Sequence, residues 1–276
     1  MRPPLFIGIC LAVVAFGLTS CHDGDKTEIP ADAAKGIKEE NITYTGDGVT
    51  MNGYVVYDST KTGKLPIVLV VHEWWGLTEY PRMRAKQLAD LGYIAMAIDM
   101  FGNGKTADNP DSAMKLAGPF YNNAAMAKAR FDAAVAKIMT YSQADTSKIA
   151  AIGYCFGGGM ALNVARLGEN LDGVVSFHGG LIGTPANKDL LKANILVCHG
   201  EADPMVPQAQ VDQFKKQMDS IGAKYTFKSY PGATHAFTNP AATETGKKFN
   251  IPVAYNGAAD TASWNDMKAF LGDVLK

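Results

Sequence analysis

The sequence has few cysteines, few charged residues and no excess of charge of either sign. Its four cysteines among 276 residues are too few for a disulfide scaffold of this size. Charged residues make up 19% of the chain, and 26 basic against 27 acidic side chains leave a net charge of −1 without a basic stripe, which argues against a nucleic-acid partner. The chain does have 28 glycines and 47% apolar residues, a composition that excludes a disordered or collagen-like protein and allows a sizeable core.

The first 21 residues are typical of a targeting segment. A positive charge at Arg2 precedes an apolar run, residues 5–18, that is too short for a membrane span of about 20 residues but suits a signal peptide. The segment ends Leu18-Thr19-Ser20-Cys21, which resembles the bacterial lipobox. We therefore expect a signal peptide over residues 1–21, a lipid on Cys21 and a bacterial cell-envelope location facing the periplasm or exterior. The alternative is an ordinary secretory signal with an incidental cysteine. The polar residues 22–40 predict a flexible tether.

Strand and helix patterns alternate through residues 41–276, which we expect to form one domain. This alternation predicts an α/β fold with a mostly parallel sheet covered by helices on both faces. Residues 41–44 and 54–57 flank Asp47-Gly48 and predict an antiparallel hairpin. Residues 102–123 and 239–257 are expected to be long loops that shape specificity. The other expected strands are 67–71, 94–98, 148–152, 173–177, 195–198 and 225–229, and the expected helices are 81–91, 124–141, 157–167, 207–221 and 258–275.

The segment Gly153-Tyr154-Cys155-Phe156-Gly157 has the pattern of a nucleophile elbow between a strand and a helix. The central residue of such a turn is strained, so the residues two positions away must be glycines to avoid a collision. The helix N-terminus favours a thiolate at Cys155, and the N–H of Phe156 would donate to an oxyanion. The alternative is a structural cysteine buried beside a tight turn.

An acid and a histidine follow Cys155 in the order that this fold requires. Asp203 comes after an expected strand and is the candidate acid, with Glu201 as its rival. His235 comes after the last expected strand and is the candidate base. In this hypothesis Asp203 orients the imidazole of His235, which takes the proton of Cys155, and the thiolate attacks an acyl carbon.

The remaining histidines and the fourth cysteine have simpler interpretations. His72 and His199 stand at strand ends and are expected to be hydrogen-bonded packing residues, whereas His178 fits either role. Cys198 lies within a strand and is expected to be a small buried hydrophobic residue. No two histidines have the spacing of metal ligands, and no dinucleotide fingerprint is present, so we expect neither a metal nor a cofactor.

Residues 40–275 resemble the dienelactone hydrolase family of α/β-hydrolases. The resemblance rests on the elbow with its cysteine, on Asp203, on His235-Ala236-Phe237, and on these further segments: Val71-His72-Glu73-Trp74-Trp75-Gly76, Gly92-Tyr93, Asp99-Met100-Phe101, and Tyr255 with Ala258-Ala259 and Trp264. It implies an α/β-hydrolase fold and a role for Glu73 in activating the thiol. It also implies that the N–H of Trp74 is the second oxyanion donor. Trp75, like Trp74, is then expected to line the pocket.

The sequence departs from the family pattern where substrate binding is expected. Enzymes of the family hold a substrate carboxylate with two arginines, and Asn103 and Asn239 stand at the corresponding positions here. Asparagine can donate hydrogen bonds but cannot form a charged bidentate clamp, so dienelactone itself is a doubtful substrate.

The function that this pattern predicts is hydrolysis of a small ester or lactone by a monomer through a thioacyl-enzyme. A peptidase, or a hydrolase of larger acyl groups or thioesters on the same fold, is the second hypothesis. The third is a non-catalytic, lipid-anchored binding protein, which would not need Cys155, Asp203 and His235 together.

Overall fold

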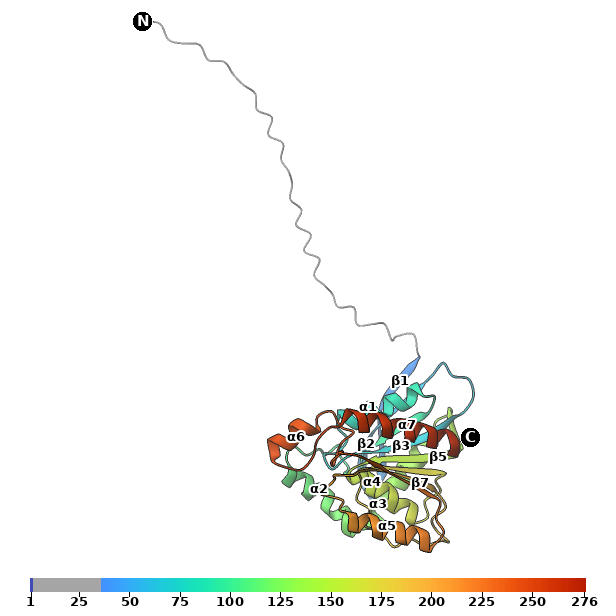
Figure 1. The fold of residues 1–276 in the computed structure, drawn as a ribbon. Coiled ribbons are helices and arrows are strands. Elements are labelled where there is room, and N and C mark those ends of the chain that lie inside the picture. The colour runs from blue at the N-terminus through green and yellow to red at the C-terminus, as the bar shows by residue number, and fades with distance from the viewer. Residues whose placement is uncertain (2–35) are drawn as a thin grey trace. The chain divides into compact units, whose positions relative to one another are not determined.

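Runs of aliphatic residues form the centre of one eight-stranded sheet in the computed structural model, which describes residue 1 and residues 36–276 (Figure 1). The strand order is β1-β2-β4-β3-β5-β6-β7-β8. Strands β3 to β8 run parallel, whereas β1 and β2 form an antiparallel hairpin and β2 pairs antiparallel with β4. The expected α/β architecture with an N-terminal hairpin is confirmed. The strands are β1 (Ile37–Gly46), β2 (Val49–Asp58), β3 (Leu65–Val71), β4 (Ile94–Ile98), β5 (Ala144–Tyr154), β6 (Gly173–Phe177), β7 (Asn194–Gly200) and β8 (Tyr225–Tyr230).

Helices cover both faces of the sheet because successive side chains of each central strand point to opposite faces. In β3, Ile67, Leu69 and Val71 belong to one core, and Val68 and Val70 to the other. Helices α1 and α7 pack on the second core, and α2 to α5 pack on the first. The helices are α1 (Glu79–Asp90), α2 (Pro110–Asn122), α3 (Ala124–Ile138), α4 (Phe156–Arg166), α5 (Gln208–Ser220), α6 (Ala242–Phe249) and α7 (Gly257–Val274).

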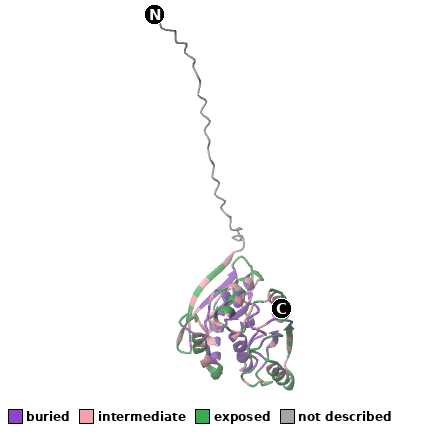
Figure 2. Cartoon of the chain, turned by 60° about the vertical axis from the view of Figure 1, so that its left-hand side comes forward, coloured by how far each residue is buried: buried purple, intermediate pink, exposed green. Residues whose placement is uncertain are grey.

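The hairpin begins earlier than the sequence suggested. Strand β1 starts at Ile37 and pairs with β2 along its whole length, so residues 37–40 belong to the sheet and not to the expected tether. The strand was hard to recognise because it lies at the edge, where mostly half-buried and exposed side chains give little apolar signal (Figure 2). The expected signal peptide, the expected lipid attachment site Cys21 and residues 22–35 of the expected tether lie outside residues 36–276. Within this range no helix combines the length and the apolar character that crossing a membrane requires.

The two segments expected to be long loops both contain helices. Helix α2 begins with a capping box, in which Asn109 accepts a hydrogen bond from the N–H of Ser112 and the Ser112 hydroxyl accepts one from the N–H of Asn109. Gly118 and Pro119 within α2 obscured this helix in the sequence. Helix α6 is only eight residues long and lies after the candidate base His235.

A buried carboxylate organises the loop after β4. Asp99 is 1% exposed and accepts hydrogen bonds from three main-chain N–H groups, those of Asn52 at 3.0 Å, Gly102 at 2.8 Å and Gly104 at 2.8 Å. The same loop is bonded to β2 through the N–H of Asn103 and the carbonyl of Thr50. Asp99 therefore holds the end of β4 against the hairpin.

Removal of this carboxylate should destabilise the fold. We expect Asp99→Ala to lower the free energy of unfolding by about 2–4 kcal/mol, because three N–H groups lose their acceptor. Denaturant unfolding followed by circular dichroism measures the change. The control is Asp189→Ala, at an exposed carboxylate, with an expected change within about 0.5 kcal/mol. Equal effects of the two substitutions would contradict this role of Asp99.

Candidate active site

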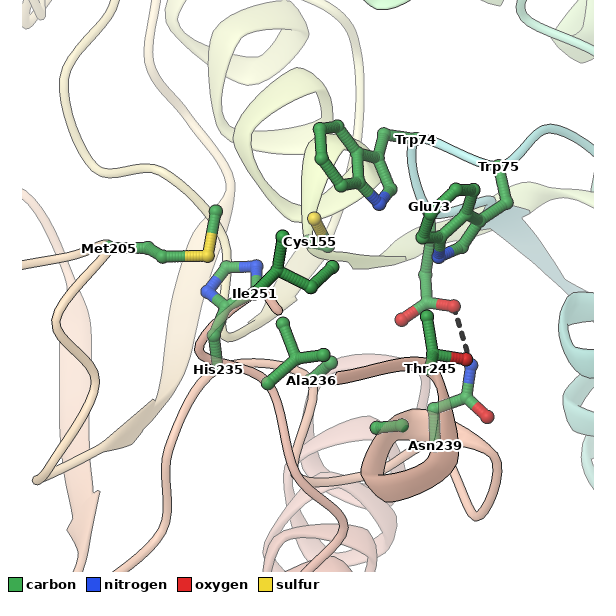
Figure 3. A pocket seen from close by; sticks show the side chains of 12 residues that line it. Glu73, Trp74, Trp75, Cys155, Met205, His235, Ala236, Asn239, Thr245 and Ile251 are labelled. Atoms are coloured by element: carbon green, nitrogen blue, oxygen red, sulfur yellow. Dashed lines mark hydrogen bonds between the residues drawn. The ribbon is translucent and has the colours of Figure 1, made fainter. Parts of the chain in front are cut away.

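Four candidate residues follow the carboxyl ends of four strands of the sheet, and Figure 3 shows three of them, Glu73, Cys155 and His235. Glu73 comes after β3, Cys155 directly after β5, Asp203 after β7 and His235 after β8. Parallel strands end at the same edge of a sheet, so the fold brings these loops together. Glu73, Asp203 and His235 are buried, and Cys155 is half-buried.

Cys155 occupies a sharp turn between β5 and α4. Its φ of 53° and ψ of −116° lie in a region that residues other than glycine rarely adopt. A Cβ on Gly153 would collide with the carbonyl of Gly157, and one on Gly157 would collide with the carbonyl of Val71. The two glycines therefore let β3, β5 and α4 approach closely enough to form the turn. The Cys155 carbonyl accepts the first hydrogen bonds of α4, from Gly158 and Gly159.

His235 is hydrogen-bonded to Asp203. Nδ1 of His235 lies 2.8 Å from Oδ2 of Asp203, whose other oxygen accepts the N–H of Met205 at 2.8 Å. Glu201, the rival acid, is exposed. Nε2 of His235 is buried without a hydrogen-bond partner among the described residues. Cys155 and His235 line the same pocket, where Figure 3 shows both. Burial alone lowers the pKa of His235, but negative charge at Cys155 and the bond to Asp203 raise it to about 10.

Glu73 lies on the opposite side of the pocket, bonded to Asn239. The amide Nδ2 of Asn239 donates to Oε2 of Glu73 at 2.6 Å (Figure 3). Burial raises the pKa of Glu73 to about 7, although Asn239 and His235 oppose the shift. The main chain at Glu73 is held by His72, which donates from Nδ1 to the Glu73 carbonyl and accepts the N–H of Met100 at Nε2. Burial lowers the pKa of His72 to about 4, so its ring is neutral at pH 7.

His178 joins the cysteine turn to the histidine loop, a role that the sequence left open. The N–H of Cys155 donates to Nδ1 of His178 at 3.1 Å as well as to the Phe177 carbonyl at 3.0 Å. Because Nδ1 accepts, the proton lies on Nε2, which donates to Oγ1 of Thr238 at 2.8 Å. Burial lowers the pKa of His178 well below its usual value, so the ring remains neutral.

A buried arginine and a tyrosine hold Thr238 in place through hydrogen bonds. Arg84 donates to the Thr238 carbonyl at 2.7 Å and pairs with Asp260 of α7. Tyr80 donates to the Thr238 hydroxyl at 2.6 Å. Thr238, Tyr80 and Arg84 were not candidates in the sequence, because their roles depend on contacts across more than 150 residues of chain.

The pocket around Cys155 has two parts. The first is a slot of about 20 Å³ between Glu73, Trp75, Asn239 and Thr245 of α6 (Figure 3). The second is an open chamber of about 520 Å³ over the start of α4. Cys155, His235, Trp74 and Met205 line both.

The main-chain N–H groups expected to bind an oxyanion lie beside this pocket. Phe156 is the first residue of α4, where an N–H has no acceptor within the helix. Trp74 lies in the loop after β3 and lines both parts of the pocket. Trp75 and Asn239 reach the slot as expected, whereas Asn103 is exposed and lines neither part, so the structure does not bring it to the site. In residues 36–276 no three His, Cys, Asp or Glu side chains are grouped so that they could hold a metal ion.

Curated proteins with related sequences include two from Aquifex. "Protein usf" of Aquifex pyrophilus is 30% identical over 85% of this chain and 98% of its own length. A protein of Aquifex aeolicus described as "Putative carboxymethylenebutenolidase" is 32% identical over 72% of this chain and 86% of its own length.

Solved structures share the fold at similar identity. The structure named m3DLH is 32% identical, with a TM-score of 0.83, and covers 87% of this chain and 100% of its own. A dienelactone hydrolase-like promiscuous phosphotriesterase from metagenomic libraries is 31% identical, with a TM-score of 0.81 and the same coverage. The sequence model described as "Dienelactone hydrolase family" matches residues 51–275. This chain therefore belongs to the dienelactone hydrolase family.

Proposed function

We propose that this protein hydrolyses a small ester or lactone through Cys155, His235 and Asp203, with a thioacyl-enzyme intermediate. The observation that carries the proposal is the bond of 2.8 Å between Asp203 and His235, which leaves Nε2 of His235 unpartnered in the pocket that holds Cys155. A histidine oriented by a carboxylate and placed beside a thiol in a strained turn is the arrangement that nucleophilic acyl transfer needs.

The first half of the reaction forms the thioacyl-enzyme. In this mechanism the imidazole of His235 takes the proton of Cys155, and the raised pKa of His235 favours the imidazolium that forms. The thiolate attacks the carbonyl carbon, and the electron pair of the C=O bond moves to oxygen. When the tetrahedral intermediate collapses, the bond to the alcohol oxygen breaks and the imidazolium gives that oxygen its proton.

The second half releases the acid. Neutral His235 takes a proton from water, and the hydroxide attacks the thioester carbon. Collapse then breaks the C–S bond and restores the thiolate and the imidazolium. In both halves the N–H groups of Phe156 and Trp74 would donate to the developing oxyanion.

Glu73 has a separate proposed role as a carboxylate that contacts the Cys155 thiol when substrate binds and helps His235 to activate it. Its pKa of about 7 suits proton exchange near neutral pH, and it lines the same slot as Cys155. Its bond to Asn239 must break or lengthen for the carboxylate to reach the sulfur. We infer that substrate entry into the slot releases Glu73 from Asn239.

The relatives support ester or lactone cleavage as the class of reaction, since one carries the description carboxymethylenebutenolidase. Acylaminoacyl peptidase from Pyrococcus horikoshii shares the fold at a TM-score of 0.66, but its 14% identity gives no support to a peptidase. A purely binding role would leave the Asp203–His235 pair beside Cys155 without a purpose.

The proposed location is the bacterial cell envelope, with the protein anchored by a lipid on Cys21. The support is the lipobox-like segment Leu18-Thr19-Ser20-Cys21 after an apolar run. Fractionation of cells expressing the full chain and Cys21→Ser would test it. The wild type should sediment with membranes and the variant should not.

Substitution of the proposed nucleophile should abolish turnover. We expect Cys155→Ala to lower kcat for p-nitrophenyl acetate by about 10³-fold or more, and Asp203→Asn by about 10²–10⁴-fold, because each removes part of the triad. The matched control is Cys198→Ala. Cys198 is fully buried in β7, and burial raises its pKa to about 12, so this substitution should leave turnover unchanged. Equal rates in wild type and Cys155→Ala would rule out the proposal.

Glu73 should make stability depend on pH in a defined direction. Its pKa is about 7 in the fold, against 4.5 for a glutamate in water. The folded state therefore binds the proton of Glu73 more tightly than the unfolded state does. The stabilisation of the fold by this proton is fully present below pH 4.5 and is lost as the pH rises through 7. Glu73→Gln cannot lose a proton, so from pH 5 to pH 9 it should gain about 2–3 kcal/mol of unfolding free energy relative to wild type.

Chemical denaturation at several pH values measures this difference. Glu79→Gln, at the exposed first residue of α1, is the matched control and should show no such pH dependence. A difference between wild type and Glu73→Gln that stays constant from pH 5 to pH 9 would contradict the assignment.

A further inference from the structure

The chamber beside Cys155 is lined by large apolar side chains from separate parts of the chain. Met114 and Tyr121 come from α2, Met160 from α4, Ile182 from the loop after β6 and Met205 from the loop after β7. These elements have no sequence pattern in common, and the fold alone brings them to one opening.

Several of these side chains are exposed to a degree that is unusual for their type. Met114 is 51% exposed, Tyr121 52%, Ile182 45% and Met205 41%. Together they make up four of the nine large apolar residues that are exposed in the described part of the chain. Exposed apolar side chains that gather at one opening are typical of a binding site, whereas single exposed apolar residues scattered over a surface are ordinary.

The chamber carries no charged group that could hold an anion. None of its lining residues is a lysine, arginine, aspartate or glutamate. Its one basic group, His235, is already paired with Asp203. A carboxylate placed in the chamber would lose water without gaining a cation, which costs free energy. The slot on the other side of Cys155 also lacks lysine and arginine.

The two parts of the pocket differ greatly in size. The slot of about 20 Å³ holds roughly one water or a small substituent, whereas the chamber of about 520 Å³ admits a large group. A substrate with its carbonyl carbon at Cys155 must therefore place its bulky part in the chamber. The three methionines there can adapt to different shapes, because their side chains are flexible and polarisable.

We propose that the substrates are uncharged esters with one bulky apolar group, which the chamber binds, and one small group, which the slot accepts. This inference rests on the proposed hydrolytic function. It separates this protein from enzymes that hold a substrate carboxylate with arginines, and it assigns Met114, Tyr121, Ile182 and Met205 as specificity-determining residues.

Two ester series test the inference with the full chain. Both start from methyl acetate: one lengthens the acyl group from methyl acetate to methyl hexanoate, and the other enlarges the alcohol from methyl to benzyl acetate, so that the second group of each ester stays small. We expect kcat/KM to rise at least about tenfold in one series, and a terminal carboxylate on the enlarged group to cancel that gain. The inference is wrong if kcat/KM rises in neither series, or if the ester with the terminal carboxylate keeps the raised kcat/KM of its neutral counterpart.

A substitution at the chamber rim should reverse this preference. Met114→Arg places a cation beside the bound group, so the ratio of kcat/KM for the anionic ester to that for its neutral counterpart should rise about tenfold. Met139→Arg is the matched control, because Met139 is also an exposed methionine, 40% exposed, but lies at the end of α3 outside the chamber. An equal change in both variants would show that the chamber does not set the preference.

Alkylation of Cys155 separates this inference from the hydrolytic function. Iodoacetamide, N-hexyl iodoacetamide and iodoacetate are compared by peptide mass spectrometry, each rate divided by the rate with free glutathione. We expect the hexyl reagent to react at least about tenfold faster than iodoacetamide, and iodoacetate more slowly. This selectivity without ester turnover would support the binding preference of the chamber and refute the hydrolytic function. Turnover of acetate with no selectivity in either assay would support the hydrolytic function and refute the binding preference.

Discussion

The close approach of main chains at the ends of three strands is the constraint on which the site depends. At the cysteine turn, Gly153 and Gly157 leave no space for a Cβ between β3, β5 and α4. At the end of β7, a Cβ on Gly200 would lie 2.6 Å from the carbonyl of Ala233 and 2.8 Å from that of Thr234. The loop that carries His235 can therefore reach Asp203 only because this strand end is also glycine. Backbone packing at these glycines thus brings the loops of Cys155, Asp203 and His235 together.

Buried polar groups then fix the orientation of what the backbone has placed. His178 accepts the N–H of Cys155 and donates to Thr238, so one neutral ring ties the strained turn to the histidine loop. Arg84 continues this chain of bonds to Asp260 of α7. A buried network is stable only when its members are paired. Nε2 of His235 has no partner among the described residues and is left for a substrate or the thiol to satisfy.

The sequence predicted the parallel sheet and the four strand-end residues because both depend on local signals. Continuous aliphatic runs mark buried strands, and Gly153 and Gly157 around Cys155 mark the turn. Predictions from the sequence failed where the sequence signals were weak or depended on distant parts of the chain. Strand β1 is an edge strand with half-exposed side chains, so its first residues, 37–40, were assigned to the tether. Helix α2 contains Gly118 and Pro119, so it was assigned to a loop. Asn103 was matched to a family position by its place after β4, but Asp99 turns that loop toward β2 and away from the pocket.

The same limits explain why only part of the chamber was foreseen. Residues 102–123 were expected to shape specificity, and they contain Met114, but no pattern in the sequence places Met114 beside Ile182 and Met205. The chemistry of the site and its selectivity therefore have different origins in the chain. Cys155, Asp203 and His235 are fixed by strand ends, where glycine and register leave little freedom. The chamber is built from connecting segments, which can change without disturbing the sheet. Asn239 shows the consequence, since it bonds Glu73 and leaves the slot without a cation while the bond between His235 and Asp203 is retained.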